Sequence, residues 1–171
     1  MSSPPVKRHR WGRTLDSTLP APTPETRARV ITRADAALLA DLMFSSYRGT
    51  PDDEGGDRAA ALAEVHSTLS GTYGPFDFVA SEIIIINDIA ASATLVTHYQ
   101  SDILIAFSMT APIHTRQGLA RAGLVRTLHR LREAGHTNAF LAVTDANTAA
   151  RHLYQSLGFV PRPLPASQNP A

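Results

Sequence analysis

Apolar and polar residues repeat along this chain with two periods, one typical of helices and one typical of strands. Residues 35–47 show the helical period, with Leu38, Leu39, Leu42 and Met43 on one side. The other predicted helices cover residues 58–69, 118–134 and 146–157. The predicted strands cover residues 27–32, 82–86, 89–99, 103–110, 138–143 and 159–160. Turns at residues 87–88 and 100–102 predict that the three central strands form an antiparallel meander.

The order of these elements predicts an α/β fold, a mixed sheet with helices on its faces. The 171 residues fit one domain, which we expect to cover residues 27–161. Residues 1–26 are rich in Pro, Ser, Thr and Arg, which predicts a poorly ordered tail. Residues 162–171 form a second Pro-rich tail that we expect to fray.

Composition narrows the possible classes of protein. Hydrophobic residues make up 43% of the chain and charged residues 18%, which is typical of a globular protein. The absence of cysteine excludes thiolate nucleophiles, thiolate metal sites and disulfides. The seven histidines show no metal-binding spacing, so we predict no metal site. No apolar run is long enough to cross a bilayer and no apolar segment follows the N-terminal charges, so a cytoplasmic location is the default.

The N-terminal segment Lys7-Arg8-His9-Arg10-Trp11-Gly12-Arg13 allows two interpretations. Arginine and tryptophan together could contact a nucleic acid, because they combine positive charge with stacking. The alternative is a solvated tail without a binding role. The net charge of +1 favours the second interpretation, since no global field attracts a nucleic acid or a membrane.

The segment from Thr110 to Arg121 has the composition of an anion-binding turn. Free main-chain N–H groups at a helix start, together with the helix dipole, attract phosphate. Gly118 and Ala120 allow close approach to a pyrophosphate, while Arg116 and Arg121 add charge. The alternative is an ordinary surface helix with basic residues. Neither a nucleoside triphosphate P-loop nor a dinucleotide fingerprint is present in this sequence.

A second polar segment lies on the last predicted helix. Asn147 and Tyr154 are seven residues apart, so they share one face of that helix and could contact the same ligand. The alternative for Tyr154 is a half-buried aromatic residue with its hydroxyl group in water.

Together the two segments resemble the coenzyme A site of the GNAT N-acetyltransferase superfamily. The family's Gln/Arg-x-x-Gly-x-Gly/Ala turn corresponds to Thr115-Arg116-Gln117-Gly118-Leu119-Ala120, and Thr110-Ala111-Pro112 matches the strand exit before it. Thr115 replaces the usual Gln or Arg, and Arg116 stands where many members have Gly.

The resemblance implies about six or seven mostly antiparallel strands, about four helices and acetyl-CoA as cofactor. The reaction it implies is transfer of an acetyl group from acetyl-CoA to a primary amine by direct attack. The cofactor-binding residues that it implies are Met109, Thr110, Thr115, Arg116, Gln117, Gly118, Leu119, Ala120, Arg121 and Asn147.

The resemblance also implies roles in catalysis. Tyr154 would protonate the departing thiolate, which is reasonable because a positioned phenol can act as a general acid. A main-chain N–H within residues 108–110 would stabilise the oxyanion, with Met109 and Thr110 as first choices. The base stays open among Glu82, His98, Asp102, His114 and a water chain.

Alternatives to this function remain. The chain could be a non-catalytic acyl-CoA-binding module, or a nucleic-acid-associated protein acting through residues 1–26. The acceptor is not identified by the sequence, although loops 48–57 and 71–77 would shape its site. An acidic loop at residues 52–57 could attract a cationic amine or simply be solvated. A homodimer stays open, because dimers are frequent in the family.

Overall fold

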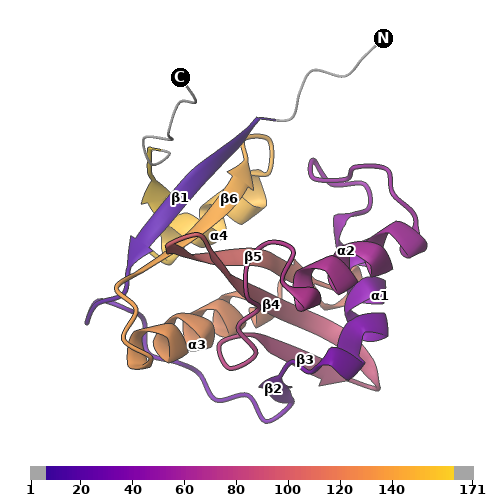
Figure 1. The fold of residues 1–171 in the computed structure, drawn as a ribbon, viewed down its shortest axis with the longest axis horizontal. Helices are drawn as coiled ribbons and strands as arrows, with labels where there is room; N and C mark the ends of the chain where they lie inside the picture. The colour runs from indigo at the N-terminus through magenta and orange to yellow at the C-terminus, as the bar shows by residue number, and fades with distance from the viewer. Residues whose placement is uncertain (1–6, 164–171) are drawn as a thin grey trace.

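In a computed structural model, which describes residues 7–163, the chain forms one mixed sheet with four α-helices. The strands are β1 (Arg8–Thr14), β2 (Ala28–Val30), β3 (Glu82–Ile86), β4 (Ile89–Tyr99), β5 (Asp102–Thr110), β6 (Asn138–Thr144) and β7 (Val160–Pro161). The helices are α1 (Ala36–Tyr47), α2 (Arg58–Ser70), α3 (Leu119–Glu133) and α4 (Thr148–Ser156), with 3-10 turns η1 (Arg33–Asp35) and η2 (Pro112–His114). The strand order is β2-β3-β4-β5-β6-β1-β7 (Figure 1). The predicted mixed fold is confirmed.

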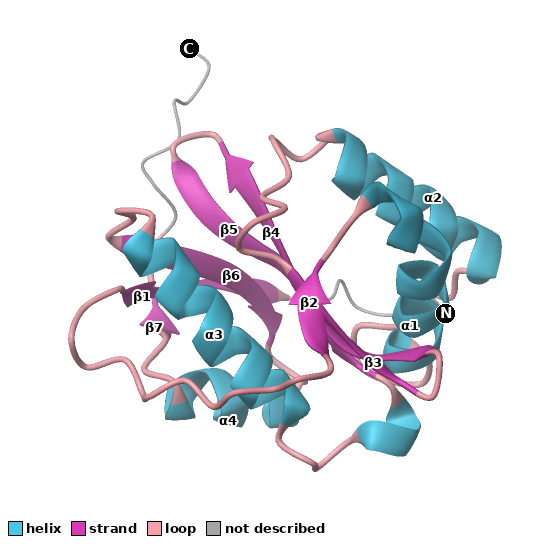
Figure 2. Ribbon diagram, turned by 90° about the horizontal axis from the view of Figure 1, so that it is seen from below, coloured by secondary structure: helices cyan, strands magenta, loops and turns pink. Residues whose placement is uncertain are grey.

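The helices cover both faces of the sheet, with α1 and α2 on one side and α3 and α4 on the other (Figure 2). Each side has its own hydrophobic core. Leu39, Leu42 and Met43 of α1 pack against the β3–β5 strands on the first side. Leu124 and Leu128 of α3 pack on the second side, in the core that also holds Tyr154 of α4. The helical period of the sequence therefore identifies the buried faces of α1 and α3.

Strands β5 and β6 separate along most of their length. All neighbouring strands pair antiparallel except these two, which run parallel and pair only at Leu104 and Phe140. A β-bulge on β5 lies just beyond this pair, because Leu95 faces Phe107 while Val96 faces Ile105. The bulged residue bends its strand and increases the local twist. The sheet therefore opens between β5 and β6.

The N-terminal segment is part of the sheet, and the predicted tail is wrong for residues 8–14. Strand β1 pairs with β6 over its whole length, from Arg8 opposite Thr144 to Thr14 opposite Asn138. Its other edge pairs with β7. Residues 1–6 and 164–171, which belong to the two predicted tails, lie outside the described residues. Arg162, also expected in a tail, donates its main-chain N–H to the carbonyl of Arg10 at 2.9 Å.

The basic and aromatic side chains of β1 contact the protein itself. Trp11 is only 3% exposed and belongs to the core under α3 and α4. The Arg10 guanidinium lies 3.7 Å from the centre of the Phe140 ring and is ion-paired with Asp102. The Arg13 side chain is buried and donates to the Thr18 hydroxyl. These contacts give β1 a structural role, so the favoured interpretation of a solvated tail is wrong for this segment, and its Trp11 and Arg10 side chains are engaged within the protein.

Among the described residues, none of the helices has the length and apolar character needed to span a membrane. The expected cytoplasmic location stays a prediction.

We expect Trp11→Ala to lower the free energy of unfolding by about 3–5 kcal/mol, because it empties a packed core position. Urea denaturation followed by circular dichroism measures this change. Val30→Ala, at a position that is 46% exposed, is the control and should change stability by less than about 0.5 kcal/mol. Equal stability of the two variants would contradict the assignment of β1 to the core.

Candidate active site

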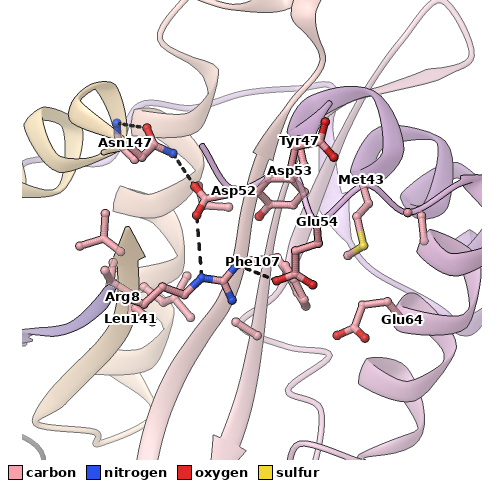
Figure 3. Close-up of a pocket in the computed structure, with 18 of the residues that line it drawn as sticks. Arg8, Met43, Tyr47, Asp52, Asp53, Glu54, Glu64, Phe107, Leu141 and Asn147 are labelled. Atoms are coloured by element: carbon pink, nitrogen blue, oxygen red, sulfur yellow. Dashed lines mark hydrogen bonds and ion pairs between the residues drawn. The ribbon is translucent and has the colours of Figure 1, made fainter. Parts of the chain in front are cut away.

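A cleft of about 750 Å³ opens where β5 and β6 separate (Figure 3). Residues 104–108 of β5 and 141–143 of β6 form its walls. Tyr47 and Met43 at the end of α1, Glu64 on α2 and the loop between these helices close one side. Asn147 and Tyr154 of α4 close the other side, so the cleft is bounded by both halves of the chain.

Tyr154 lines this cleft, on the face of α4 that we expect from the sequence to meet the cofactor. Its side chain is 9% exposed and packs edge-on against Phe159 at 6.0 Å between ring centres. Burial raises the pKa of Tyr154 to about 12, although a hydrogen bond with the Ser108 side chain acts in the opposite direction. The phenol therefore keeps its proton at neutral pH. A second phenol, Tyr47, lines the same cleft, and burial raises its pKa as well.

Two main-chain amides of β5 are directed toward the opening. Ala111 donates its N–H to the Ala91 carbonyl of β4 at 2.9 Å, and hydrogen-bonded positions alternate along an antiparallel ladder. The Met109 amide, two residues away, is therefore directed toward β4. The amides of Ser108 and Thr110 point to the other edge, where β6 has separated. Of the predicted oxyanion donors, Thr110 fits this alternation and Met109 does not.

The loop between α1 and α2 reaches across the cleft. The Asp52 carboxylate accepts hydrogen bonds from the Thr144 hydroxyl at the end of β6 and from the Asn147 amide of α4, the latter at 2.7 Å. Arg8 of β1 lies 3.9 Å from Asp52 and donates to the Glu54 carboxylate at 2.9 Å (Figure 3). The interpretation of this loop as simply solvated is wrong at Asp52, whose side chain is only 16% exposed.

Asn147 has both ends of its side chain engaged. Its oxygen caps α4 by accepting from the Ala150 N–H at 3.1 Å, while its nitrogen donates to Asp52. The amide nitrogen carries a second N–H, which a cofactor could use while the first stays bonded to Asp52. The loop and the predicted cofactor contact therefore meet at the same group.

Carboxylates outnumber guanidinium groups around the cleft. The lining acids are Asp52, Asp53, Glu54, Asp57 and Glu64, whereas the lining bases are Arg8 and Arg48. Most of these acids already have partners: Asp53 accepts from the main-chain amides of Gly49 and Gly55, and Asp57 caps α2. Glu64 accepts only a hydrogen bond from the Tyr73 hydroxyl, at 3.0 Å. The acidic wall favours a cationic ligand on this side.

The predicted phosphate-binding turn forms the start of α3, outside the lining of the cleft. Gly118 has a φ of 77° and caps the helix without a side-chain hydrogen bond, so the first amides of α3 lack an acceptor from a capping side chain. A methyl group built at Gly118 would meet no atom within 4 Å, which leaves the turn open. Residues 115–118 and Arg121 are exposed, Ala120 is half-buried and Leu119 is buried in the core.

None of the four predicted bases lines the cleft. His98 is hydrogen-bonded to Asp77, and Asp102 is ion-paired with Arg10. His114 lies in η2, ahead of the α3 turn. Each of these residues is therefore placed away from the chemistry that we expected it to serve.

Glu82 is the most deeply buried of the four bases, at 1% exposure. It faces α3, where its carboxylate pairs with Arg126 and Arg130. The glycine at position 123 lets α3 approach the Glu82 carboxylate closely, since a methyl group there would lie 3.3 Å from it. Glu82 fixes α3 to the sheet instead of accepting a proton in the cleft.

The family that these features indicate is confirmed by comparison. Residues 41–159 match the family described as Acetyltransferase (GNAT) family. The chain belongs to the GNAT acetyltransferase family. This is a family of acyltransferases, and its match covers the α3 turn and every residue that lines the cleft except Arg8. A search of curated proteins gives no match.

Solved structures similar to this GNAT chain agree on the fold. A GCN5-related N-acetyltransferase from Sphaerobacter thermophilus has a TM-score of 0.70 at 18% identity, over 93% of this chain and 50% of its own. The ribosomal-protein-S18-alanine N-acetyltransferase from Escherichia coli has a TM-score of 0.61 at 20% identity, over 78% and 76%. The PaiA N-acetyltransferase from Thermoplasma acidophilum, solved with coenzyme A, has a TM-score of 0.63 at 12% identity, over 82% and 92%. The chain thus spans only half the length of the Sphaerobacter protein.

Sequence reasoning missed several residues of this GNAT site. Arg8 was assigned to a tail, although it lines the cleft and binds the loop. The only sequence feature that could have indicated Tyr47 is its position as the last aromatic residue of a predicted helix, directly before the Gly-containing loop. The hydrogen bond from Tyr73 to Glu64 joins the loop after α2 to that helix, and no sequence periodicity indicates it.

We expect Asp52→Ala to release the loop, because it removes two hydrogen bonds to a charged group, each worth about 1.5–3 kcal/mol. Amide hydrogen exchange in residues 48–57, measured by mass spectrometry, should become at least about tenfold faster. Asp53→Ala is the comparison variant: it removes the same charge from the same loop, but its carboxylate accepts from the Gly49 and Gly55 amides within the loop, so faster exchange should stay confined to those two amides. Equal exchange in both variants would show that Asp52 does not hold the loop.

Proposed function

We propose that this chain transfers an acetyl group from acetyl-CoA to a cationic primary amine, by direct attack of the amine. The observation that carries the proposal is the opening between β5 and β6, with Tyr154 on one wall and carboxylates on the other. Family membership supports acetyl transfer in general. The acidic wall supports the choice of a cationic amine, which would be held there before its attack.

The start of α3 fits a diphosphate. Its first amides meet no capping side chain, Gly118 leaves the turn open, and Arg116 and Arg121 are exposed beside it. These are the features that an anion needs at a helix N-terminus. Residues 115–121 would hold the diphosphate, and Asn147 would contact the pantetheine arm through the N–H that Asp52 does not use. Acetyl-CoA, when bound, supplies the acetyl group as a thioester.

Three groups of the chain would act on the reacting atoms. The amides of Ser108 and Thr110 would stabilise the negative charge that develops on the carbonyl oxygen. Tyr154, whose phenol lines the cleft and is protonated at neutral pH, would donate its proton to the sulfur as the thiolate leaves. The carboxylates around the cleft would orient the amine and receive its proton, directly or through water, because none of the four candidate bases from the sequence lines the cleft.

Acetyl-CoA binding is the first test. Calorimetry should detect binding of acetyl-CoA to the wild-type chain, and Arg116→Glu/Arg121→Glu should weaken it at least about tenfold, equivalent to about 1.4 kcal/mol. The control Arg132→Glu reverses a charge at the other end of α3 and should leave the affinity unchanged. A wild-type trace without heat would reject the proposal.

Binding without thiol release, over a panel of mono- and polyamines, would instead support the alternative, a non-catalytic acyl-CoA-binding module. Thiol release with neutral amines only would reject the cationic acceptor but leave acetyl transfer in place.

Tyr154→Phe should lower kcat at pH 7 by about a hundredfold or more, the usual contribution of a positioned general acid. The affinity for acetyl-CoA, measured by calorimetry, should stay within about twofold, since the variant keeps the ring and its packing against Phe159. Thiol release assayed with a thiol reagent gives kcat. An unchanged kcat would remove Tyr154 from the mechanism.

A further inference from the structure

A second cluster of ionisable side chains lies outside the lining of the acetyl-transfer cleft. It consists of Asp77 in the loop between α2 and β3, His98 near the end of β4, and His136 directly after α3. Their ligand atoms all lie within 4.8 Å of one another. Three segments that are far apart in the sequence therefore bring one carboxylate and two imidazoles to one point.

Asp77 and His98 are positioned by a main-chain ladder. Residues 75–77 run beside the end of β4: Asp77 donates its N–H to the Val96 carbonyl and His98 donates to the Pro75 carbonyl, both at 2.9 Å. One oxygen of Asp77 accepts two amides of the following turn, at 2.8 and 3.1 Å. The other oxygen lies 2.9 Å from Nε2 of His98. The carboxylate is thus oriented by bonds that leave its second oxygen directed at the histidine.

His136 is positioned by the end of α3. The helix closes with Gly135 at a φ of 92°, and the His136 N–H donates to the Leu131 carbonyl at 3.0 Å. These bonds form a Schellman motif, which fixes the residue that follows the glycine. Val96 packs in the core under α3, and residues two apart on a strand share a face, so His98 is directed to the same side. The rings of His98 and His136 lie 5.5 Å apart, edge to face.

The donor set and its spacing fit a transition-metal ion. Zinc binds imidazole nitrogen and carboxylate oxygen at about 2.0–2.2 Å, so two ligand atoms on a tetrahedral ion lie about 3.4 Å apart. Asp77 and His98 are already at that separation within about 0.5 Å. The His98 side chain is 38% exposed, which gives an ion access from solvent. Imidazole suits zinc, copper and nickel, whereas magnesium and calcium prefer oxygen ligands.

We propose that Asp77, His98 and His136 bind a divalent transition-metal ion, with zinc as the expected ion and water as its fourth ligand. The ion takes the place of the hydrogen bond between Asp77 and His98. It connects the loop before β3, the end of β4 and the end of α3, so it stabilises the packing of α3 on the sheet. The site is independent of the proposed acetyl transfer, because its three residues do not line the cleft.

The chain contains a matched comparison for this site. His9 and Asp145 form a second histidine–carboxylate pair, also at 2.9 Å. Among residues 7–163, only Asp77, His98 and His136 form a group of three ligands that close together. The His9–Asp145 pair therefore separates the effect of a third ligand from that of an ordinary ion pair.

The test uses the untagged full chain, stripped of metal with a chelator and titrated with zinc by calorimetry. We expect one zinc ion per chain, a rise of several degrees in the thermal midpoint, and a four-coordinate visible spectrum when cobalt replaces zinc. His136→Ala should weaken zinc binding at least about tenfold and abolish the thermal shift. His9→Ala should leave both unchanged.

Asp77→Asn serves as a second variant, because it keeps an oxygen for the two amides of the turn while removing the anionic ligand. Weaker zinc binding in this variant supports the site even where His136→Ala does not fold. The proposal is overturned if the wild-type chain binds no stoichiometric zinc. It is also overturned if zinc binds equally well to the wild-type chain and to whichever cluster variants fold.

Discussion

Strand β6 is held in the sheet by β1, and this arrangement allows the cleft to exist. A strand that separates from its neighbour leaves main-chain groups without partners along that edge, and such groups are costly when they are buried. Here β6 pairs with β5 at Leu104 and Phe140 alone, yet pairs with β1 from Arg8 to Thr14 on its other edge. The second edge keeps β6 in place while the first edge stays open. The amides of β5 that face the opening are then free to serve a ligand.

The same strand connects the sheet to the loop that crosses the cleft. Trp11 anchors β1 in the core, and Arg8, three residues earlier, reaches the carboxylates of Asp52 and Glu54. Asp52 in turn holds Asn147, whose side chain also caps α4. The loop is therefore coupled to the two elements that border the cleft on its far side.

Local patterns predicted most of the fold because they act over short distances. The Asn87-Asp88 turn has both φ angles positive, as a tight hairpin requires, and the strands on either side match their predicted bounds. Strand β1 could not be found in this way. It holds three arginines among seven residues and lacks apolar alternation, and its stability comes from β6, more than a hundred residues later, and from the Phe140 ring under Arg10.

The site was predicted less completely for a related reason. Strand alternation indicates which residues share a face but not which helix covers that face, so Glu82 could not be assigned to α3 rather than to the cleft. The seven-residue spacing predicted that Asn147 and Tyr154 share a face, and both line the cleft, whereas the catalytic role of Tyr154 came from the family resemblance and stays a prediction. The carboxylates of the cleft come from a loop and from α2, and only the folded chain brings them together.

The net charge is only +1, but positive and negative side chains gather at different places, and each place suits one of the two proposed ligands. The open turn at Gly118 carries Arg116 and Arg121, while five carboxylates face the cleft against two guanidinium groups. An anionic diphosphate and a cationic amine would each meet the opposite charge, and each would be disfavoured at the other's site. Tyr154, neutral and buried in the cleft, adds no charge to either environment. In the proposed reaction, this separation of charge would place the two ligands before any contact specific to the acyl group is made.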